Sequence, residues 1–411
     1  MTSKAEVTRL EKVLNFANGR TSPIRDDDLS IPVYGSNGLI GRASESNSSE
    51  GTIVIGRVGS YCGSVHFSKE SCWVTDNAIK ATAKDGNDPF FLYYILKYLN
   101  LNNWRSGSGQ PLLNQSTLNA IEALIPPYSV QLQISSFLYA IDDRIKLLQE
   151  TNSTLESIAQ ALFKSWFVDF DPVRAKQEGR QSEGMDEATA ALFPDTFETT
   201  KLGELPTAWR ISNIGAELTS ILGGTPSRAR PEFWKEGSVA WINSGKVNEY
   251  RITTASELIT DEALSRSATK LLPARTTVLA ITGATLGQIS IVEIAACANQ
   301  SVIGILQNEK FSTEFIYFWI NFNIKKLISS QTGGAQQHIN KGNVEELPLL
   351  VPDIQILNRF KSIAQPLFIK IAENCFQIST LSSIRDSLLP RLISGQIRLP
   401  DYEEQIGTAT T

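Results

Sequence analysis

Few residues of this 411-residue chain have the types and spacing that chemistry requires. Two carboxylate pairs, Asp142/Asp143 and Asp169/Asp171, have the residue type for general acid–base work. Both pairs lie on or beside a long helical pattern, so a solvated helix face is the simpler explanation. The chain has only two histidines, His66 and His338, which nearly excludes a multi-histidine metal site.

Motifs that bind nucleotides or activate nucleophiles are also missing. There is no G-x-x-x-x-G-K-[ST] loop, and no G-x-G-x-x-G follows a strand. The glycines of "SGSGQP" are followed by proline and leucines, and "DFDPV" lacks the second proline and the aromatic of an amino-methyltransferase motif. Neither histidine has a nucleophile at a recognisable spacing. We therefore expect that the chain is not an enzyme by itself and holds no metal or cofactor.

Composition indicates a soluble protein of two or three domains, because 42% of the residues are hydrophobic and 20% are charged. No apolar run approaches the ~20 residues of a membrane span. The start "MTSKAEVTRLEKVL" lacks the apolar core of a signal peptide. The four cysteines are scattered, as in reduced proteins. We expect a cytoplasmic protein without a membrane partner.

The negative charge is concentrated in one segment. The net charge is −5, but residues 176–206 alone contain seven acidic and three basic side chains. Residues 1–128 contain twelve of each sign, and residues 207–352 contain thirteen basic and twelve acidic side chains. Either large segment can therefore still present a basic face.

An internal duplication is the strongest signal. "TIVIGRVGSYCGSV" from Thr52 matches "TTVLAITGATLGQI" from Thr276, which predicts a strand, a glycine turn and a strand in both copies. "FFLYYIL" from Phe90 matches "EFIYFWI" from Glu314, and "SGSGQPLLNQ" matches "TGGAQQHINK". "NGRTSPI" at Asn18 matches "GGTPSRA" at Gly223.

A long helical pattern follows each copy. Residues at alternating spacings of four and three form an apolar seam from 134 to 166 and again from 360 to 392. Thirty-three helical residues span ~50 Å. A seam this long exceeds the needs of a small domain, so we expect the two helices to pair with each other rather than only with their own domains.

Two copies of one unit usually relate by a two-fold axis, which predicts antiparallel pairing. Each seam contains one asparagine, Asn152 at an a position and Asn374 at a d position, and the register that pairs them is the one we expect. The residues expected to pair are Asn152 with Asn374, Leu148 with Ile378, and Leu155 with Ile371. Arg385 is a misfit that needs an acidic or solvent outlet.

The stretch "LFKSWFVDFDPV" contains aromatic residues that lie outside the seam. Phe163, Phe167 and Phe170 fall off the seam and must pack on a globular domain or on a partner subunit, and we expect them to contribute a docking surface for a partner subunit. Asp169, Asp171 and Pro172 are expected to end the helix. The acidic, glycine-containing segment that follows reads as a surface connection.

Several of these stretches carry a family resemblance. "LFKSWFVDFDPVRAK" (162–176) and "SIRDSLLPRLISGQIRLP" (383–400) resemble the central and C-terminal conserved regions of the specificity subunit of type I restriction–modification systems. "LPTAWRISNIGAELTSILGGTPSRARPEFW" (205–234) and "WINSGKV" (241–247) resemble the start of that family's second target recognition domain. Residues 19–42 fit a first recognition domain only in outline.

The resemblance implies a fold and a function. The fold would be α+β, with two similar α/β target recognition domains and two long helices that form an antiparallel coiled coil with an internal pseudo-two-fold repeat. The expected segments are recognition domain 1 (1–128), the central helix (129–174), an acidic linker (175–204), recognition domain 2 (205–352), the C-terminal helix (353–400) and a tail (401–411).

In this family each domain would read one half of a bipartite asymmetric site in double-stranded DNA. The helices would set the gap and dock two methyltransferase (modification) subunits, and motor–nuclease (restriction) subunits would join the complex. S-adenosylmethionine and ATP would belong to those partners.

Base edges are read by Arg, Lys, Asn and Gln, and phosphates are bound by Lys, Arg, Ser and Thr. The expected DNA-contacting residues of the first domain are Arg20, Thr21, Ser22, Asn37, Arg42, Arg57, Tyr61, Arg105 and Gln110. Those of the second domain are Thr225, Ser227, Arg228, Arg230, Asn243, Ser244, Lys246, Gln336 and Lys341. Alternatives are an orphan DNA-binding regulator, a coiled-coil scaffold that binds only proteins and, more weakly, a DNA-modifying enzyme.

Overall fold

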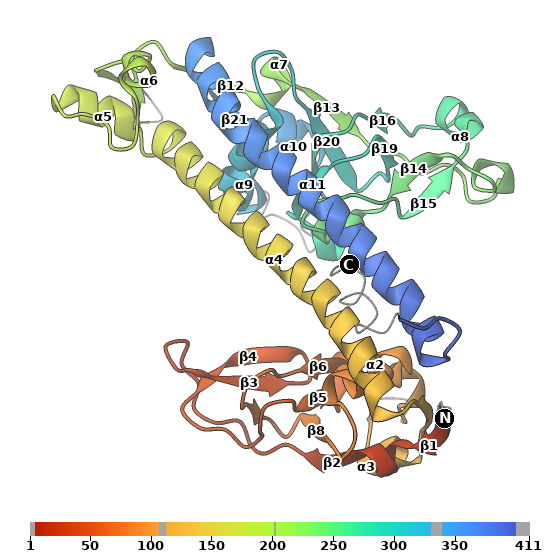
Figure 1. The fold of residues 1–411 in the computed structure, drawn as a ribbon. Coiled ribbons are helices and arrows are strands. Elements are labelled where there is room, and N and C mark those ends of the chain that lie inside the picture. Colours follow the sequence, from red (N-terminus) through yellow and green to blue (C-terminus); the bar gives the residue numbers. More distant parts are fainter. Residues whose placement is uncertain (1–4, 107–111, 201–202, 330–338, 400–411) are drawn as a thin grey trace, which may run out of the picture. The chain divides into compact units, whose positions relative to one another are not determined.

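The structure, a computed structural model, describes residues 5–106, 112–200, 203–329 and 339–399. It divides into two compact units: unit 1 is Met1–Ile145 with Thr380–Thr411, and unit 2 is Lys146–Ser379. Two helices of 40 residues each, α4 (Tyr128–Phe167) and α11 (Ile354–Ile393), contribute to both units (Figure 1). Within the described ranges, no helix is both long enough and apolar enough to cross a membrane.

Unit 1 contains a four-stranded sheet in the order β2-β8-β5-β6 and a three-stranded sheet in the order β4-β3-β7. Helix α2 begins at Pro89 because Asp88 accepts a hydrogen bond from the Phe91 amide and caps it. The remaining elements are β1 (Glu6–Arg9), α1 (Leu10–Val13), β2 (Leu14–Asn18), β3 (Ile31–Gly35), β4 (Gly38–Ala43), β5 (Ile53–Gly56), η1 (Gly59–Tyr61), β6 (Val65–Phe67), β7 (Trp73–Val74), β8 (Ala78–Ala83), α2 (Pro89–Tyr98), η2 (Leu101–Trp104), α3 (Gln115–Ala120) and β9 (Glu122–Ile125).

Unit 2 repeats this plan, with four-stranded sheets in the orders β13-β20-β17-β18 and β15-β14-β19-β16. Its elements are α5 (Asp171–Gln177), α6 (Glu187–Ala191), β10 (Phe197–Thr200), β11 (Gly203–Pro206), β12 (Arg210–Asn213), α7 (Ile214–Glu217), β13 (Thr219–Leu222), η3 (Pro231–Phe233), β14 (Val239–Ile242), η4 (Ser244–Asn248), β15 (Glu257–Ile259), α8 (Asp261–Arg266), β16 (Leu271–Leu272), β17 (Thr276–Ala280), η5 (Gly283–Thr285), β18 (Ile289–Val292), β19 (Ala296–Ala298), β20 (Val302–Leu306), α9 (Thr313–Ser329), α10 (Lys341–Glu345) and β21 (Pro348–Val351).

The predicted glycine turns are present in both units. Each β-branched strand, β5 or β17, leads through a short 3₁₀ turn into an antiparallel partner, β6 or β18. Gly59 and Gly283 open these turns with φ of 74° and 71°, a conformation that side chains with a Cβ rarely adopt. The matched apolar stretches form helices α2 and α9.

The two long helices pair antiparallel in the register that the seam predicts. In unit 2, Asn374 Nδ2 donates a 2.8 Å hydrogen bond to Asn152 Oδ1, and both side chains are buried. The rings of Trp166 and Phe360 lie 6.2 Å apart in the same register. Leu148 and Ile371 are buried along the seam, whereas Leu155 and Ile378 are half-buried. In unit 1, the seam arginine has the acidic outlet that it needs, because Arg385 Nη1 donates to Asp142 at 2.7 Å.

The segment after α4 is more ordered than a surface connection. Helix α4 ends at Phe167, Phe170 adopts a left-handed φ of 57°, and Asp171 and Pro172 open a new helix, α5. The acidic segment then forms α6 and the β10–β11 hairpin. Val173 and Phe193 are buried in the core of unit 2. The predicted surface connection is therefore partly buried, because Phe193 packs against Trp166 near the end of α4.

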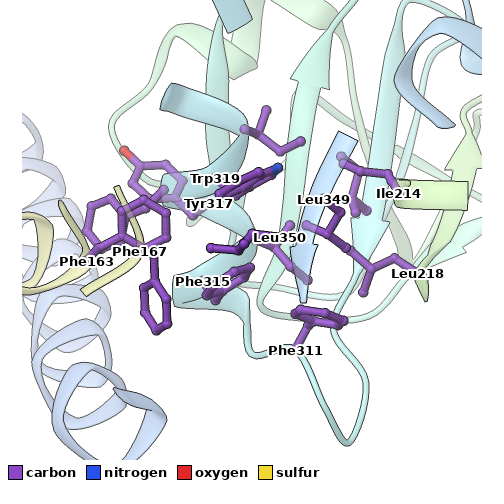
Figure 2. Close-up of a cluster of buried hydrophobic side chains, with 14 of the residues drawn as sticks. Phe163, Phe167, Ile214, Leu218, Phe311, Phe315, Tyr317, Trp319, Leu349 and Leu350 are labelled. Atoms are coloured by element: carbon purple, nitrogen blue, oxygen red, sulfur yellow. The ribbon is translucent and has the colours of Figure 1, made fainter. Parts of the chain in front are cut away.

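Of the two alternatives for the three phenylalanines, partner docking is wrong for Phe163 and Phe167, which pack on a globular domain. Phe163 and Phe167 are 3% and 2% exposed, and they point toward α9 (Figure 2). The Phe163 ring lies 5.6 Å from Phe315, and the Phe167 ring lies 5.0 Å from it. Phe170 is half-buried against Phe197 and Trp209 of the same unit. These rings leave the seam in order to anchor the recognition domain on α4.

The asparagine pair yields the first prediction. Replacing Asn152 alone with leucine leaves the Asn374 amide buried without this partner, which should lower the free energy of unfolding by ~1–3 kcal/mol. Replacing both asparagines with leucine should recover most of that loss. Urea unfolding measures both effects, with Gln160→Leu on the exposed face of α4 as the control. A double variant no more stable than the single one would contradict the pairing.

The aromatic anchor yields a second prediction. Phe163→Ala should cost about 3–5 kcal/mol of unfolding free energy, because it opens a cavity in the core. Leu147→Ala, at a position that is 52% exposed on the same helix, should change stability by less than ~0.5 kcal/mol. A Phe163→Ala protein of unchanged stability that failed to bind a partner subunit would instead restore the docking interpretation.

Candidate nucleic-acid interface

The predicted contact residues of unit 2 gather where several strands end. Strands β13 and β17 both run antiparallel to β20, so they finish at the same edge of the sheet. Thr225 follows β13, and its hydroxyl donates to Gln300 Oε1 at 2.5 Å. Strand β14 ends at this edge too, since the Asn299 amide donates to the Ile242 carbonyl at 3.0 Å. Asn243 and Ser244 follow directly.

Unit 1 builds the same edge from its own strands. Strands β2 and β5 both run antiparallel to β8, so Arg20 after β2 and Arg57 after β5 emerge together. Thr21 and Ser22 continue the first loop, and exposed Tyr61 closes the second. The β3–β4 turn that contains Asn37 is tied to this edge, because the Ser64 hydroxyl donates to the Ser36 carbonyl at 2.5 Å.

In both domains, a segment near the C-terminal end hydrogen-bonds to the residue that follows the strand at this edge. The Leu113 amide donates to the Arg57 carbonyl at 3.0 Å, and the equivalent Ile339 amide donates to the Ile281 carbonyl at 3.0 Å. A bridge between Ser106 and Leu112 brings Arg105 alongside. Lys341 opens α10 two residues after Ile339. Gln110 and Gln336 belong to these returning segments, but they lie outside the described residues.

Backbone contacts correct the alignment of the two copies by one residue. The Gly19 amide donates to the Ala78 carbonyl, and the Gly223 amide donates to the Val302 carbonyl, both at 3.0 Å. A Cβ on either glycine would lie about 2 Å from a carbonyl oxygen, so neither position accepts a side chain. Gly19 is therefore equivalent to Gly223 rather than to Gly224, and Thr21 is equivalent to Thr225.

Several predicted cations of unit 2 are already engaged by carboxylates. Arg228 donates two 2.7 Å hydrogen bonds to Glu257, and its guanidinium stacks 3.5 Å from the Trp234 ring centroid. These hydrogen bonds lower the pKa of Glu257. Both arms of the Arg228 guanidinium are therefore occupied in this structure, and its contact with DNA stays a prediction.

Two lysines of this edge have similar partners. Lys246 Nζ lies 2.7 Å from both Glu249 and Thr254, and the amide of Lys246 donates to the Asn243 side chain at 3.2 Å. Lys341 lies 3.4 Å from Glu345. In contrast, exposed Arg230 forms no ion pair within the described ranges, and its guanidinium lies over the Phe233 ring.

Positive charge at the edge of unit 1 is less compensated. Arg20, Arg57 and Arg105 form no ion pair with any residue that the structure describes. The Nε of Arg57 is buried without a hydrogen-bond partner there. Arg42 does not join this edge: it donates to the Ser30 carbonyl at 2.6 Å and pairs with Pro32, at the far end of the hairpin from Asn37.

Sequence reasoning missed polar residues on the strand that enters this edge. Gln300 accepts from Thr225, and Asn77 occupies a similar place before β8, where its carbonyl accepts from the Arg57 amide at 3.0 Å. The available signal was the polar "TDN" and "NQS" that precede matched apolar runs in both copies. The part of the chain that is described contains no group of three or more potential metal ligands. Hydroxyls, amides and guanidinium groups at one edge suit the recognition of a polar, anionic polymer.

Comparison with known proteins shows the family to which the chain belongs. A family model described as the type I restriction modification DNA specificity domain matches residues 2–157 and again residues 206–373. The chain belongs to the type I restriction–modification DNA specificity family. The two matches confirm the duplication that the sequence predicts, and each covers one copy of the specificity domain.

Relatives and a solved structure agree. The type I restriction enzyme MjaIX specificity subunit of Methanocaldococcus jannaschii is 28% identical over 327 residues, which are 77% of this chain and 71% of the relative. The HindI specificity subunit of Haemophilus influenzae is 29% identical over 336 residues, which are 71% of this chain and 72% of the relative. The crystal structure of a type I restriction–modification S subunit from M. genitalium matches 97% of each chain with a TM-score of 0.61 at 16% identity, so the fold is shared.

Substitutions of Arg228, which is ion-paired, and of Arg230, which forms no ion pair within the described ranges, should have different effects. Arg230→Ala should leave the unfolding temperature unchanged and weaken binding of cognate duplex DNA by ~1–3 kcal/mol if it reads a base, or lower the salt slope by about 1 if it contacts a phosphate. Arg228→Ala and Glu257→Gln should each make the loop around Arg228 more mobile, because each breaks the Arg228–Glu257 ion pair. Titrations at several salt concentrations measure this, and unchanged binding by Arg230→Ala would exclude that residue.

Proposed function

We propose that this chain is the sequence-recognition subunit of a type I restriction–modification complex, in which each domain reads one half of a bipartite, asymmetric DNA site. The observation that carries the proposal is the repeated strand edge. Both units present loops at the same structural positions, but the side chains differ: Arg20, Arg57 and Tyr61 in unit 1 are replaced by Gly224, Ile281 and Thr285 in unit 2. A shared framework with different polar groups suits two unlike half-sites.

The long helices would set the spacing between the half-sites. A 40-residue helix is ~60 Å long, which exceeds the ~34–36 Å of one DNA turn. The paired asparagines fix one register of α4 against α11, so the spacing would be a property of the fold rather than of a flexible linker.

The catalytic groups would belong to partner subunits. Two methyltransferase subunits would dock on the specificity subunit and supply S-adenosylmethionine, and motor–nuclease subunits would supply ATP-driven translocation and cleavage. The missing nucleotide-binding and nucleophile motifs support a non-catalytic role for this chain. Such a complex would work in the cytoplasm.

The uncompensated arginines of unit 1 favour DNA over a purely protein-binding scaffold. Exposed Arg20 and Arg105 lie at one edge together with Arg57, whose guanidinium has an unused donor within the described structure. Cations placed together without carboxylates attract a polyanion, and the association should weaken steeply with salt.

Mapping methylated adenines in the genome of the host tests the proposal. We expect two methylated adenines in one fixed bipartite motif, and both should disappear when the gene for this chain is deleted. Replacing residues of one edge only, with Arg57→Ala and Arg105→Ala together, should relax or abolish recognition of one half of the motif. A host methylome without any bipartite motif, from cells that express all the subunits, would refute the function.

A further inference from the structure

One buried arginine of unit 2 connects the recognition domain to both long helices. The side chain of Arg251 is 0% exposed. Its Nη2 lies 3.6 Å from Glu156 of α4, and its guanidinium lies 5.2 Å from the ring centroid of Phe368 of α11. Within the domain, it lies 4.8 Å from the ring centroid of Tyr317 of α9, and its Nε lies 3.8 Å from Glu293. The Arg251 guanidinium therefore lies where α4, α11, α9 and the segment that contains Glu293 meet.

The carboxylates around Arg251 restrict where its guanidinium can lie. A buried guanidinium is costly unless carboxylates compensate it, and here the two carboxylates come from different elements. Glu156 is itself oriented, because Tyr317 donates a 2.7 Å hydrogen bond to its Oε1. Moving the domain along α4 would separate Arg251 from Glu156 while Glu293 stayed with the domain. The electrostatic energy therefore favours one position of the domain on the helix.

Arg251 also lies at the end of the segment that presents the DNA-facing residues. Asn243 and Ser244 begin this segment at the strand edge, and η4 continues it to Asn248. The next residues turn onto α4, where the Tyr250 hydroxyl donates to the Asn152 carbonyl at 3.4 Å. The side chain of Asn152 is the acceptor in the asparagine pair. Eight residues thus lead from the candidate interface to the register-fixing pair of the helices.

A cavity of about 630 Å³ lies beside Arg251, lined by Glu249, Tyr250 and Thr253 on one side and by polar residues of α4 on the other. Arg251 and Tyr250 contact α4 beside this cavity, on Glu156 and on the Asn152 carbonyl.

We propose that Arg251 is a positioning residue for half-site spacing: it fixes the 243–251 segment to the middle of the paired helices, so that the second domain faces DNA in one orientation along them. Its role is indirect, because its side chain is buried and cannot touch DNA. This inference rests on the proposed function for its consequence, but its structural part can be measured without DNA.

Hydrogen–deuterium exchange of the full chain tests the structural part. Arg251→Met should raise amide exchange in residues 243–252 and around Glu156 by on the order of 10-fold, and leave β17 unchanged. Arg266→Met, which breaks an exposed ion pair with Glu262, is the matched control and should change neither region. Unchanged exchange in 243–252, or a uniform rise that includes β17, would overturn the proposal, since a uniform rise reports only lost global stability.

Binding by the complete complex with its modification subunits tests the functional part. The probes are duplexes with the mapped site and with its spacer lengthened or shortened by one base pair. Arg251→Met should reduce the preference for the native spacer by on the order of 10-fold. An unchanged preference would overturn the role in spacing. A host without a bipartite site would refute the proposed function instead, while the exchange experiment would still decide the attachment.

Two further variants keep the test decisive if Arg251→Met does not fold. Glu156→Gln keeps the shape of the partner and removes its charge, and Arg251→Lys keeps the charge and removes the planar fork. If Arg251→Met does not fold, Glu156→Gln should reproduce both the local exchange and the loss of spacing preference. Should Glu156→Gln behave as wild type in both assays, Arg251 does not act through α4.

Discussion

The hydrogen bond between Asn152 and Asn374 is the constraint on which the rest of unit 2 depends. Apolar seam residues would tolerate several registers, because leucine and isoleucine pack against one another with little preference. A buried amide tolerates only the register in which its partner lies opposite it. In this register Trp166 meets Phe360, so one polar contact helps to set the position of apolar side chains on the two helices.

The two recognition domains show which features a duplicated fold retains and which it changes. Both copies keep the glycine at which an added Cβ would lie about 2 Å from a neighbouring carbonyl oxygen, and both keep the asparagine caps of α3 and α10. These positions are restricted by backbone geometry. The loop side chains are not restricted in this way, and they differ between the copies. At the edge of unit 1, Arg20, Arg57 and Arg105 form no ion pair within the described residues, whereas Arg228, Lys246 and Lys341 of unit 2 are paired with carboxylates, so the two edges offer different chemistry to DNA.

Much of the fold could be predicted from periodicity and repetition. The glycine turns, the seam and its register follow from spacings that reflect only local geometry and one-dimensional pattern. The hydrogen-bond and ion-pair partners of the candidate site residues could not be predicted in this way. Arg228 has the residue type of a base reader, but Glu257 lies beside it, and nothing in the local sequence brings together residues 29 positions apart. The sequence could not show whether a partner subunit or the chain itself covers Phe163 and Phe167, because their burial requires α9, more than 140 residues later.

The sequence by itself determined the duplication, the family and the antiparallel seam, since each depends on matches or spacings along the chain. Only the tertiary structure decided which polar groups are free, because hydrogen bonds and ion pairs between distant segments satisfy some and leave others. It also placed Arg251 between Glu156 and Glu293, which are separated by 137 residues. A buried charge acquires its role from the carboxylates that the fold brings to it, and those distances exist only after folding.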